Sequence, residues 1–492
     1  ADRIDVGFVD RHAARLAGDA AHPALDFGAA APAPQPSEAA GEAALPQAPT
    51  GAEAVPVPND CRLVELLAAE GDRVAPGQTL AITEAMKMEF AVTAPFGGVV
   101  ASAPWSPGDA LAKGAPLLFL RPDGADLAVE TVERQMDPDH IRPDLQALFD
   151  DRRLISDEGR PEAVAKRHAT RKRTARENLA DLCDPGSFRE FGAHALAAQR
   201  GRRSVEELKR ASPADGVVTG LATINAGRFG PAAASCAVMA YDYTVFAGTQ
   251  GIQGHLKKNR LFRLAETDRL PLVMFVEGGG GRPGDTDELA VLRLHNPTFA
   301  NVARLKSLVP VISVVSGRCF AGNAALAAAS DVIVATRDAS LGMGGPAMIE
   351  GGGLGRVAAE AVGPVSMQAP NGVLDLVVED EAEAVAAVKT LLAFVQGPAA
   401  DWTAPDPRML RHVVPQEPRR AYRMQDLVAG LADEGSVVVL REEYGLAFLT
   451  AFARIEGRPV AILANNPEHL GGAIDAAGAA KAAEFAALVE KL

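Results

Sequence analysis

The chain has 492 residues, 48% of them hydrophobic and 23% charged, and this length predicts two to four globular domains. Its formal net charge of −14 disfavours nucleic-acid binding, and no apolar run reaches the roughly 20 residues of a membrane span. The cysteines lack metal-site spacing, so we expect no metal site and free thiols in a reducing, cytoplasmic compartment. They are Cys61, Cys183, Cys236 and Cys319.

Two different patterns occupy the first 54 residues. Residues 1–20 include an amphipathic patch from Ile4 to His12, and we expect them to be the tail of a preceding domain. Residues 21–54 consist mostly of Ala, Pro, Gly and Glu, which cannot bury enough apolar surface to order themselves. We therefore expect a flexible linker there, beside a domain that must swing.

An internal repeat marks residues 55–122. The pattern Gly-Asp-x-Val/Leu-x-x-Gly-x-x-Leu begins at Gly71 and again at Gly108, with turn residues around short apolar runs that predict strands. Such a repeat usually reflects a duplicated supersecondary unit, so we expect two halves packed face to face in a small flattened all-β barrel. Lys87 lies between the halves, at an expected tight turn that projects its side chain away from the core.

The run Glu84-Ala85-Met86-Lys87-Met88-Glu89 resembles the biotin-attachment sequence of the biotin carboxyl carrier family, and the resemblance extends from about Val55 to Pro122. It implies that a biotin protein ligase attaches biotin covalently to Lys87, between Met86 and Met88. The related lipoyl domains share the barrel but usually have an acidic residue before the lysine, so Met86 favours biotin. The alternative is a plain surface lysine between two core methionines.

The chain becomes helical and charged after Asp123, and we expect a helical linker over residues 123–165. Thr174 and Glu177 then have the spacing of a capping box at the start of a helix. The basic run from Lys166 to Arg176 is interpreted as the solvated start of a helix. Its alternative role is to contact the phosphates of a nucleotide-like ligand.

A strand–helix rhythm with glycine loops follows. The expected strands are 217–224, 232–239, 272–276, 309–315 and 331–335, and the expected helices are 254–267 and 324–329. Four glycines, Gly278 to Gly281, follow the third strand, and Gly322 precedes the second helix. This arrangement aims backbone N–H groups and a helix dipole at an anion, although a permissive loop without a ligand is the alternative. Neither G-x-G-x-x-G nor G-K-[ST] occurs there, which disfavours a dinucleotide or phosphate loop.

Residues 166–400 resemble the first half of the carboxyltransferases of acyl-CoA carboxylases. That family usually has Asp-Ser-Gly-Gly-Ala-Arg where this chain has Glu277-Gly278-Gly279-Gly280-Gly281-Arg282, and Ala-Gly-Gly-Ala where it has Ala321-Gly322-Asn323-Ala324. The match implies that Gly279 and Gly280 hold the acyl-CoA carbonyl and that Gly322 adds a nearby backbone group. The implied fold class is multidomain, a biotinyl/lipoyl-like barrel plus an α/β crotonase-like (ClpP/crotonase superfamily) carboxyltransferase.

Residues 401–492 look like the incomplete start of a second carboxyltransferase half. Thr219–Ile224 resembles Thr450–Ile455, and the helix with Lys258 resembles the helix with Lys481. The family's second glycine loop, which holds biotin, would be expected just beyond Leu492. We therefore expect a fragment of a single-chain, multidomain biotin-dependent acyl-CoA carboxylase.

The resemblance implies that CO2 moves from carboxybiotin on Lys87 to the α-carbon of an acyl-CoA. The cofactor supplies the base and the protein supplies orientation and electrostatics, so His255, His295 and His412 are expected to be structural. The resemblance also implies a biotin carboxylase domain, on the same full-length chain or a partner subunit, that uses ATP, bicarbonate and Mg²⁺. A homo-oligomer, such as a hexamer, is expected.

Two alternatives remain open at this point. A biotin-dependent decarboxylase or transcarboxylase would use the same two modules, and an ATP-dependent domain upstream would favour the carboxylase. A biotin carrier and scaffold without catalysis would have vestigial glycine loops.

Overall fold

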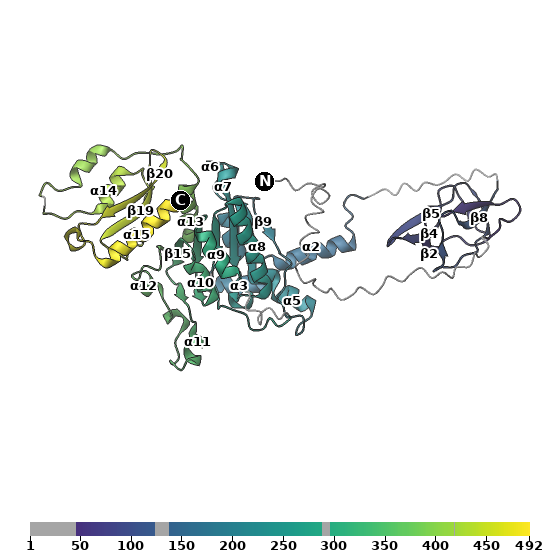
Figure 1. Cartoon of the computed structure of the whole chain (residues 1–492), viewed down its shortest axis with the longest axis horizontal. Helices are drawn as coiled ribbons and strands as arrows, with labels where there is room; N and C mark the ends of the chain where they lie inside the picture. Colours follow the sequence, from purple (N-terminus) through teal and green to yellow (C-terminus); the bar gives the residue numbers. More distant parts are fainter. Residues whose placement is uncertain (1–45, 124–136, 288–295, 418) are drawn as a thin grey trace, which may run out of the picture. The chain divides into compact units, whose positions relative to one another are not determined.

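The computed structural model of the chain describes residues 46–123, 137–287, 296–417 and 419–492. It divides into two compact units, Ala1–Pro138 and Asp139–Leu492 (Figure 1). The expected domain tail at 1–20 and most of the expected linker at 21–54 lie outside the described residues. Among the helices that the structure does describe, none is long and apolar enough to cross a membrane.

The first unit is a small barrel of short antiparallel strands. Its strands are β1 (Glu53–Pro56), β2 (Cys61–Leu66), β3 (Arg73–Val74), β4 (Thr79–Ala85), β5 (Met88–Thr93), β6 (Gly98–Ser102), β7 (Ala110–Leu111) and β8 (Pro116–Pro122). They form two four-stranded sheets, with orders β1-β8-β6-β3 and β5-β4-β2-β7. Leu63, Leu80 and Leu117 are completely buried between the sheets. The predicted all-β barrel is therefore confirmed.

The two copies of the sequence repeat build matching turns. Asp72 and Asp109 each accept a hydrogen bond at 2.8 Å from the backbone N–H three residues earlier. Gly71 and Gly108 have φ angles of 91° and 101°, which glycine adopts without a steric penalty. One turn leads into β3 and the other into β7, which belong to different sheets. The repeat therefore corresponds to a duplicated half-barrel, as predicted.

The second unit is built on a seven-stranded sheet. Its strands are β9 (Arg189–Phe191), β10 (Val217–Thr223), β11 (Ser235–Tyr241), β12 (Leu272–Phe275), β13 (Val311–Val315), β15 (Val332–Thr336) and β17 (Leu376–Val378). The order is β17-β15-β13-β12-β11-β10-β9. Neighbouring strands from β11 to β17 are parallel, whereas β9 and β10 pair in antiparallel fashion at one edge.

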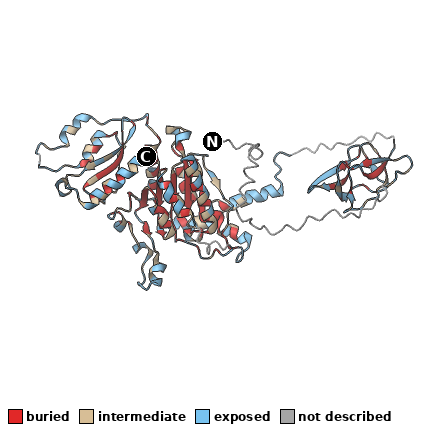
Figure 2. Cartoon of the chain, viewed as in Figure 1, coloured by how far each residue is buried: buried red, intermediate tan, exposed pale blue. Residues whose placement is uncertain are grey.

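The helices of this unit include the crossovers that its parallel strands require. Those up to residue 395 are α2 (Pro143–Ile155), α3 (Pro161–Ala169), α4 (Ala175–Leu182), α5 (Val205–Ala211), α6 (Ala226–Phe229), α7 (Pro231–Ala234), α8 (Ile252–Asp268), α9 (Thr298–Lys306), α10 (Gly322–Ala328), α11 (Pro346–Gly351), α12 (Val365–Gln368) and α13 (Glu381–Val395). Those on one face of the sheet include α8, α9 and α10, which pack through Phe262, Val302 and Leu326. Leu182 of α4 and Val388 of α13 pack on the other face. The strands between these layers form the buried interior seen in Figure 2.

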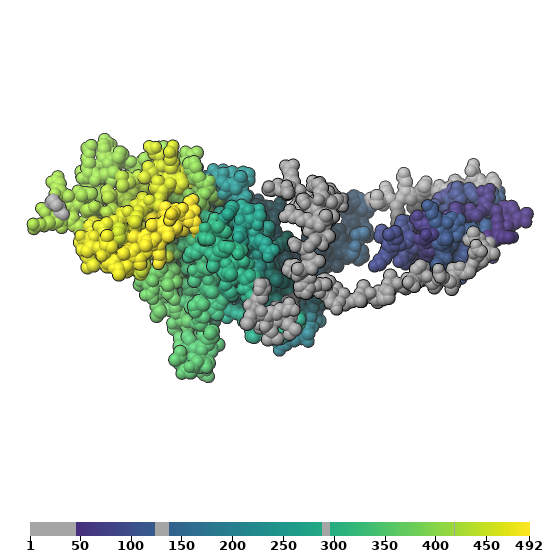
Figure 3. Space-filling model, viewed as in Figure 1, coloured from purple at the N-terminus to yellow at the C-terminus, as the bar shows by residue number. Residues whose placement is uncertain are grey.

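A small parallel pair and a protruding arm complete this part of the unit. β14 (Arg318–Phe320) pairs with β16 (Ser340–Gly342), and α10 begins directly after β14. The segment around α11 stands away from the rest of the unit (Figure 3). Its Met348 and Leu354 are 64% and 79% exposed, so the arm has no hydrophobic core of its own.

A separate three-stranded sheet follows residue 400. It consists of β18 (Val438–Leu440), β19 (Phe448–Ile455) and β20 (Arg458–Asn465), flanked by α14 (Met424–Leu431) and α15 (Ala476–Lys491). Phe452 of β19 lies between Phe394 of α13 and Phe485 of α15, with ring centroids 5.6 and 5.5 Å apart. This contact joins the sheet to the larger core of the same unit.

Most expected elements lie within a few residues of their observed positions, and one start was wrong. The strand expected at 232–239 begins only at Ser235, because residues 231–234 form α7. Pro231 occupies the first helical position of α7, where its missing N–H costs nothing. The capping box is confirmed: Thr174 Oγ1 accepts from the Glu177 N–H at 3.0 Å, and the Glu177 carboxylate accepts from the Thr174 N–H at 2.7 Å.

Candidate functional site

Lys87 lies at the tip of the β4–β5 hairpin. Ala85 pairs with Met88 across the hairpin, so Met86 and Lys87 alone form the turn, with φ angles of 51° and 67°. Two residues with positive φ match the twist of a tight hairpin. Met86 is 98% exposed and Met88 is 63% exposed, and Lys87 is exposed as well. The lysine therefore projects from the barrel as predicted, whereas the alternative of two core methionines is wrong.

The first glycine loop follows β12 and crosses the end of β14. The Gly278 N–H donates to the Arg318 carbonyl at 2.7 Å, and the Phe320 N–H donates to the Gly278 carbonyl at 2.9 Å. Gly278 and Gly280 have φ angles of 140° and 90°, in the range that favours glycine. Within the described residues, the N–H groups of Gly279 and Gly280 have no backbone or side-chain acceptor.

The second loop brings Gly322 next to the first. A Cβ placed on Gly280 would lie 2.8 Å from the Ala321 Cβ and 3.8 Å from the Gly322 nitrogen. Ala321 has a φ of 51°, a strained value for a residue with a side chain, at the junction of β14 and α10. The structure therefore brings Gly280 and Gly322 together, with Gly279 beside them. Their backbone donors form a candidate oxyanion hole, meaning a site for a negatively charged oxygen.

A buried ion pair anchors the start of the first loop. Arg167 Nη1 and Nη2 donate to the two carboxylate oxygens of Glu277 at 2.9 and 2.6 Å. Their side chains are only 8% and 11% exposed. Burial opposes the charge of Arg167, but the hydrogen bonds and charge of Glu277 outweigh it, so the pKa of Arg167 is raised. Glu277 thus acts as a fixed support for the glycines that follow it.

A second buried ion pair holds the other end of the loop. Arg282 pairs with Asp215, and these side chains are 4% and 0% exposed. The Asp215 carboxylate also accepts from the Gly254 N–H at 2.6 Å, and Asp285 accepts from the Ile252 N–H at 3.0 Å. Both carboxylates therefore cap the first turn of α8, where negative charge is favourable.

The basic run at 166–176 is not simply a solvated start of a helix, and that interpretation is corrected here. Arg167 is buried, and Lys172 Nζ donates to Ser316 Oγ at 2.9 Å and to Asp338 Oδ1 at 2.7 Å. Arg167 belongs to the basic run and Glu277 to the glycine motif, so both residues lay in motifs that the sequence marks. Spacing along the chain gives no hint that they pair.

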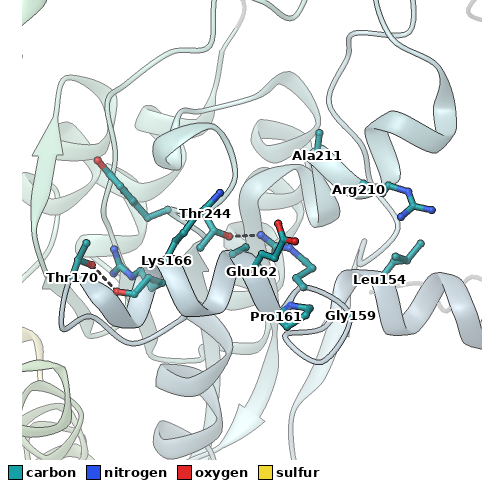
Figure 4. Close-up of a pocket in the computed structure, with 13 residues that line it drawn as sticks. Leu154, Gly159, Pro161, Glu162, Lys166, Thr170, Arg210, Ala211 and Thr244 are labelled. Atoms are coloured by element: carbon teal, nitrogen blue, oxygen red, sulfur yellow. Dashed lines mark hydrogen bonds between the residues drawn. The ribbon is translucent and has the colours of Figure 1, made fainter.

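A pocket of about 650 Å³ opens beside Arg167 (Figure 4). It is lined by residues from the end of α2, from α3, from the end of α5 and from the loop after β11. Arg160 is paired with Asp242, whereas Lys166 and Arg210 have no acidic partner in the described part of the chain. These two cations make the pocket suitable for an anionic ligand.

The histidines do not form a catalytic constellation in the described residues. His255 Nδ1 lies 3.0 Å from Thr298 Oγ1, and burial lowers the pKa of His255 to about 3, so this ring stays neutral. His412 ends a short 3₁₀ helix far along the chain, and His295 lies outside the described residues. Among the residues that the structure describes, no cluster of His, Cys, Asp or Glu could hold a metal ion. The four cysteines have no disulfide partner there.

Two protein families match the chain. Residues 166–492 match the family described as carboxyl transferase domain, and residues 53–120 match the family described as biotin-requiring enzyme. The first match covers the seven-stranded sheet, both glycine loops and the later three-stranded sheet, and the second covers the barrel with Lys87.

Curated relatives agree with these matches. The chain is 33% identical over 352 residues to the methylmalonyl-CoA carboxyltransferase 12S subunit of Propionibacterium freudenreichii subsp. shermanii, an alignment covering 69% of this chain and 64% of that protein. It is 32% identical over 348 residues to the biotin-dependent long chain acyl-coenzyme A carboxylase beta4 subunit of Mycobacterium tuberculosis, covering 68% and 63%. The chain thus spans less than two thirds of these relatives.

Solved structures extend the comparison to the whole chain. A single-chain, multi-domain long-chain acyl-CoA carboxylase has a TM-score of 0.69 and 47% identity, over 99% of this chain and 44% of that one. The transcarboxylase 12S structure, described as a hexamer assembly with methylmalonyl-CoA bound, has a TM-score of 0.61 and 30% identity, over 71% and 68%.

Proposed function

Because this chain belongs to the carboxyl transferase domain family and also has a biotin-requiring domain, we propose that it is the carrier and carboxyltransferase part of a biotin-dependent acyl-CoA carboxylase. In this proposal the chain moves CO2 from biotin on Lys87 to the α-carbon of an acyl-CoA. The observation that carries the proposal is the coexistence of two features: an exposed lysine at a hairpin tip, and backbone donors without acceptors where two glycine loops meet.

The surroundings of Lys87 suit a covalent biotin. Its side chain lies in solvent on a turn of only two residues, where a ligase can reach it. Met86 and Met88 offer exposed, adaptable apolar surface on either side. When bound, biotin supplies the transferred carboxyl group and the base. The protein's part at this end of the chain is to hold the lysine away from the barrel.

The candidate oxyanion hole suits the acceptor. Removing a proton from the α-carbon of a thioester places negative charge on the carbonyl oxygen. The N–H groups of Gly279, Gly280 and Gly322 are the donors that we assign to this oxygen. Fixed donors stabilise such charge without reorganisation, and losing one typically costs roughly 100- to 1000-fold in rate. The buried pairs Arg167–Glu277 and Arg282–Asp215 hold the loop that presents two of the three donors.

The pocket of Figure 4 suits the phosphorylated end of coenzyme A. Arg167 lines this pocket and also pairs with Glu277, the residue that precedes the first glycine loop, so the pocket and the loop are connected through one side chain. Lys166 and Arg210 are the cations that we assign to its phosphates. For Lys166, this assignment agrees with the alternative role of the basic run, which is to contact the phosphates of a nucleotide-like ligand.

The remaining parts of the proposal concern partners and boundaries. We propose residues 166–400 and 401–492 as the first carboxyltransferase half and the start of the second. Attachment of biotin would require a biotin protein ligase, and carboxylation of the attached biotin would require a biotin carboxylase domain that uses ATP, bicarbonate and Mg²⁺. The single-chain neighbour and the hexameric neighbour support a longer chain and a homo-hexamer. The four free cysteines support a cytoplasmic location.

Biotinylation is tested by intact mass after co-expression with a biotin protein ligase. We expect one biotin-sized addition, lost in Lys87→Arg and kept in Lys113→Arg. Lys113 is the control because it is an exposed lysine of the same barrel, in the second copy of the repeat, where it matches Pro76 rather than Lys87. If the mass of the unaltered chain shows no biotin-sized addition, the carrier role is ruled out. An addition that persists in Lys87→Arg would place biotin on another residue.

Carboxyl transfer is tested in the full-length gene product with labelled bicarbonate, ATP and a series of acyl-CoAs. Label in the acyl-CoA product supports the carboxylase. The relative named methylmalonyl-CoA carboxyltransferase favours a second candidate, a transcarboxylase. Transfer from a carboxylated acyl-CoA donor without ATP would support that candidate instead. Biotinylation without either transfer would leave a carrier scaffold.

A further inference from the structure

One residue contacts both glycine loops. The backbone N–H of Gln250 donates to the Gly280 carbonyl at 2.6 Å, and the Gln250 carbonyl accepts from the Arg282 N–H at 3.0 Å. Its side chain extends to the second loop, where Nε2 donates to Asn323 Oδ1 at 3.0 Å. Asn323 directly follows Gly322, so Gln250 joins the two loops that supply the candidate oxyanion hole.

Lys258 of α8 determines which way the side-chain amide of Gln250 points. Lys258 is completely buried, and its Nζ donates to the Tyr241 hydroxyl at 2.6 Å and to Gln250 Oε1 at 3.1 Å. Below its pKa of about 7, the Lys258 amine is an ammonium group with donors only, so it must face the oxygen of the amide. The nitrogen of the Gln250 amide is then left to face Asn323.

The same direction continues through Asn323 to the backbone. Because Asn323 Oδ1 accepts from Gln250, its Nδ2 is the donor that remains. It donates to the Gly248 carbonyl at 3.2 Å and to the Glu277 carbonyl at 3.0 Å. Asn323 is completely buried, so water does not compete for these bonds. The chain of hydrogen bonds thus runs from Lys258 to the residue that opens the first glycine loop.

We propose that Gln250 and Asn323 are positioning residues that hold the N–H groups of Gly280 and Gly322 at a fixed separation, while Lys258 sets the direction of both side-chain amides. The catalytic meaning of this inference rests on the proposed function, but the structural claim does not. Preorganisation matters because a misplacement of about 1 Å can cost roughly 100-fold in rate. Asn323 stands where the carboxyltransferase pattern has glycine. The amide bridge therefore depends on a residue at which this chain differs from that pattern.

Hydrogen–deuterium exchange of this chain tests the structural claim. Gln250→Met and Asn323→Leu have nearly the original shape without the amide. We expect faster exchange in peptides that cover 277–283 and 321–326 in both variants. Asn301→Leu is the matched control, because it removes another amide–amide bond, 3.2 Å long, between α9 and α8. Exchange at both loops that equals that of the unaltered chain would overturn the proposal.

Gln250→Glu serves if either variant fails to fold. It keeps an oxygen for Lys258 but removes the donor to Asn323, so the same faster exchange is expected. The direction set by Lys258 is tested with Lys258→Met and Lys258→Arg. The proposed direction is supported if exchange at 321–326 is faster in Lys258→Met and returns toward that of the unaltered chain in Lys258→Arg. The arginine side chain, like the ammonium, offers donors only. Unchanged exchange in Lys258→Met overturns that part.

Kinetics of the full-length protein test the catalytic meaning. For Gln250→Met and Asn323→Leu we expect kcat to fall by about 100-fold with little change in KM for the acyl-CoA, because ground-state contacts elsewhere are intact. A change confined to KM would overturn a positioning role. If the unaltered protein transfers no carboxyl group, the proposed function fails, and the exchange result still decides whether the amide bridge holds the loops.

Discussion

Arg167 and Glu277 are joined by two parallel hydrogen bonds, 2.9 and 2.6 Å long, although 110 residues separate them in the chain. The pair ties α3 to the first residue of the glycine loop. Glu381 lies 3.7 Å from the same guanidinium and accepts from Ser316 Oγ, so the pair belongs to a larger buried network. The position of the loop therefore depends on charges that are shielded from water.

Arg167→Met should destabilise the second unit strongly. It leaves the Glu277 carboxylate buried without its partner, and breaking a buried pair in this way costs about 3–5 kcal/mol. Arg318→Met is the matched control, because Arg318 and Glu360 form an exposed pair of the kind worth at most about 1 kcal/mol. Denaturant unfolding measures both. Equal losses in the two variants would contradict a special role for the buried pair.

Gly280→Ala should lower stability by roughly 1–2 kcal/mol, the usual cost of a left-handed conformation for a residue with a side chain. Its φ is 90°, and the new Cβ would lie 2.8 Å from that of Ala321. Gly281→Ala is the neighbouring control, because its φ is not positive and its Cβ would meet nothing within 4 Å. Thermal unfolding of the two variants should differ accordingly. A similar melting temperature for both would contradict the left-handed conformation of Gly280 and its close approach to Ala321.

Because of Lys258, the free energy of unfolding of the second unit should increase as the pH rises above 7. Burial lowers the pKa of Lys258 from 10.5 to about 7, so between these values the unfolded chain holds a proton that the folded chain has lost. Stability therefore rises with pH across this window. Lys258→Met should reduce the slope by up to about 1.4 kcal/mol per pH unit. Urea unfolding at pH 7, 8 and 9 measures the slopes, and an unchanged slope in Lys258→Met would count against a buried amine.

Lys166→Glu and Arg210→Glu should each weaken binding of coenzyme A by about tenfold or more, because charge-assisted bonds to phosphate contribute about 1.5–3 kcal/mol. The effect should shrink in high salt. Arg228→Glu is a control at a distant cation that pairs with Asp401. Calorimetric titration of the unaltered chain and of the three variants gives the four affinities. Equal affinity in all variants would place the phosphates outside the pocket.

The sequence was sufficient for features that are local in the chain. The Gly-Asp repeat, the turn at Lys87 and the Thr174–Glu177 capping box each follow from a few adjacent residues. The start of β11 was missed by three residues because apolar alanines after Pro231 suit a short helix as well as a strand. The glycine loops could be located, since four consecutive glycines stand out in any context.

Long-range polar contacts could not be predicted in the same way. Lys258 was noted only as part of a repeated helix, and nothing near it in the chain signals its bonds to Tyr241 and Gln250. Arg167 lay inside a basic run that resembled a solvated surface. Burial of a charged group depends on which distant partner the fold brings to it, and one sequence alone does not contain that pairing.

The hairpin at Lys87 puts two demands on the same two positions. A two-residue turn with positive φ at both positions prefers Asn followed by Gly. This one has Met86 and Lys87, at φ angles of 51° and 67°. Screening the barrel for heat resistance alone would therefore enrich replacements at both positions and discard the attachment point with them. Any engineering campaign on this unit should select for biotin retention and for melting temperature at the same time.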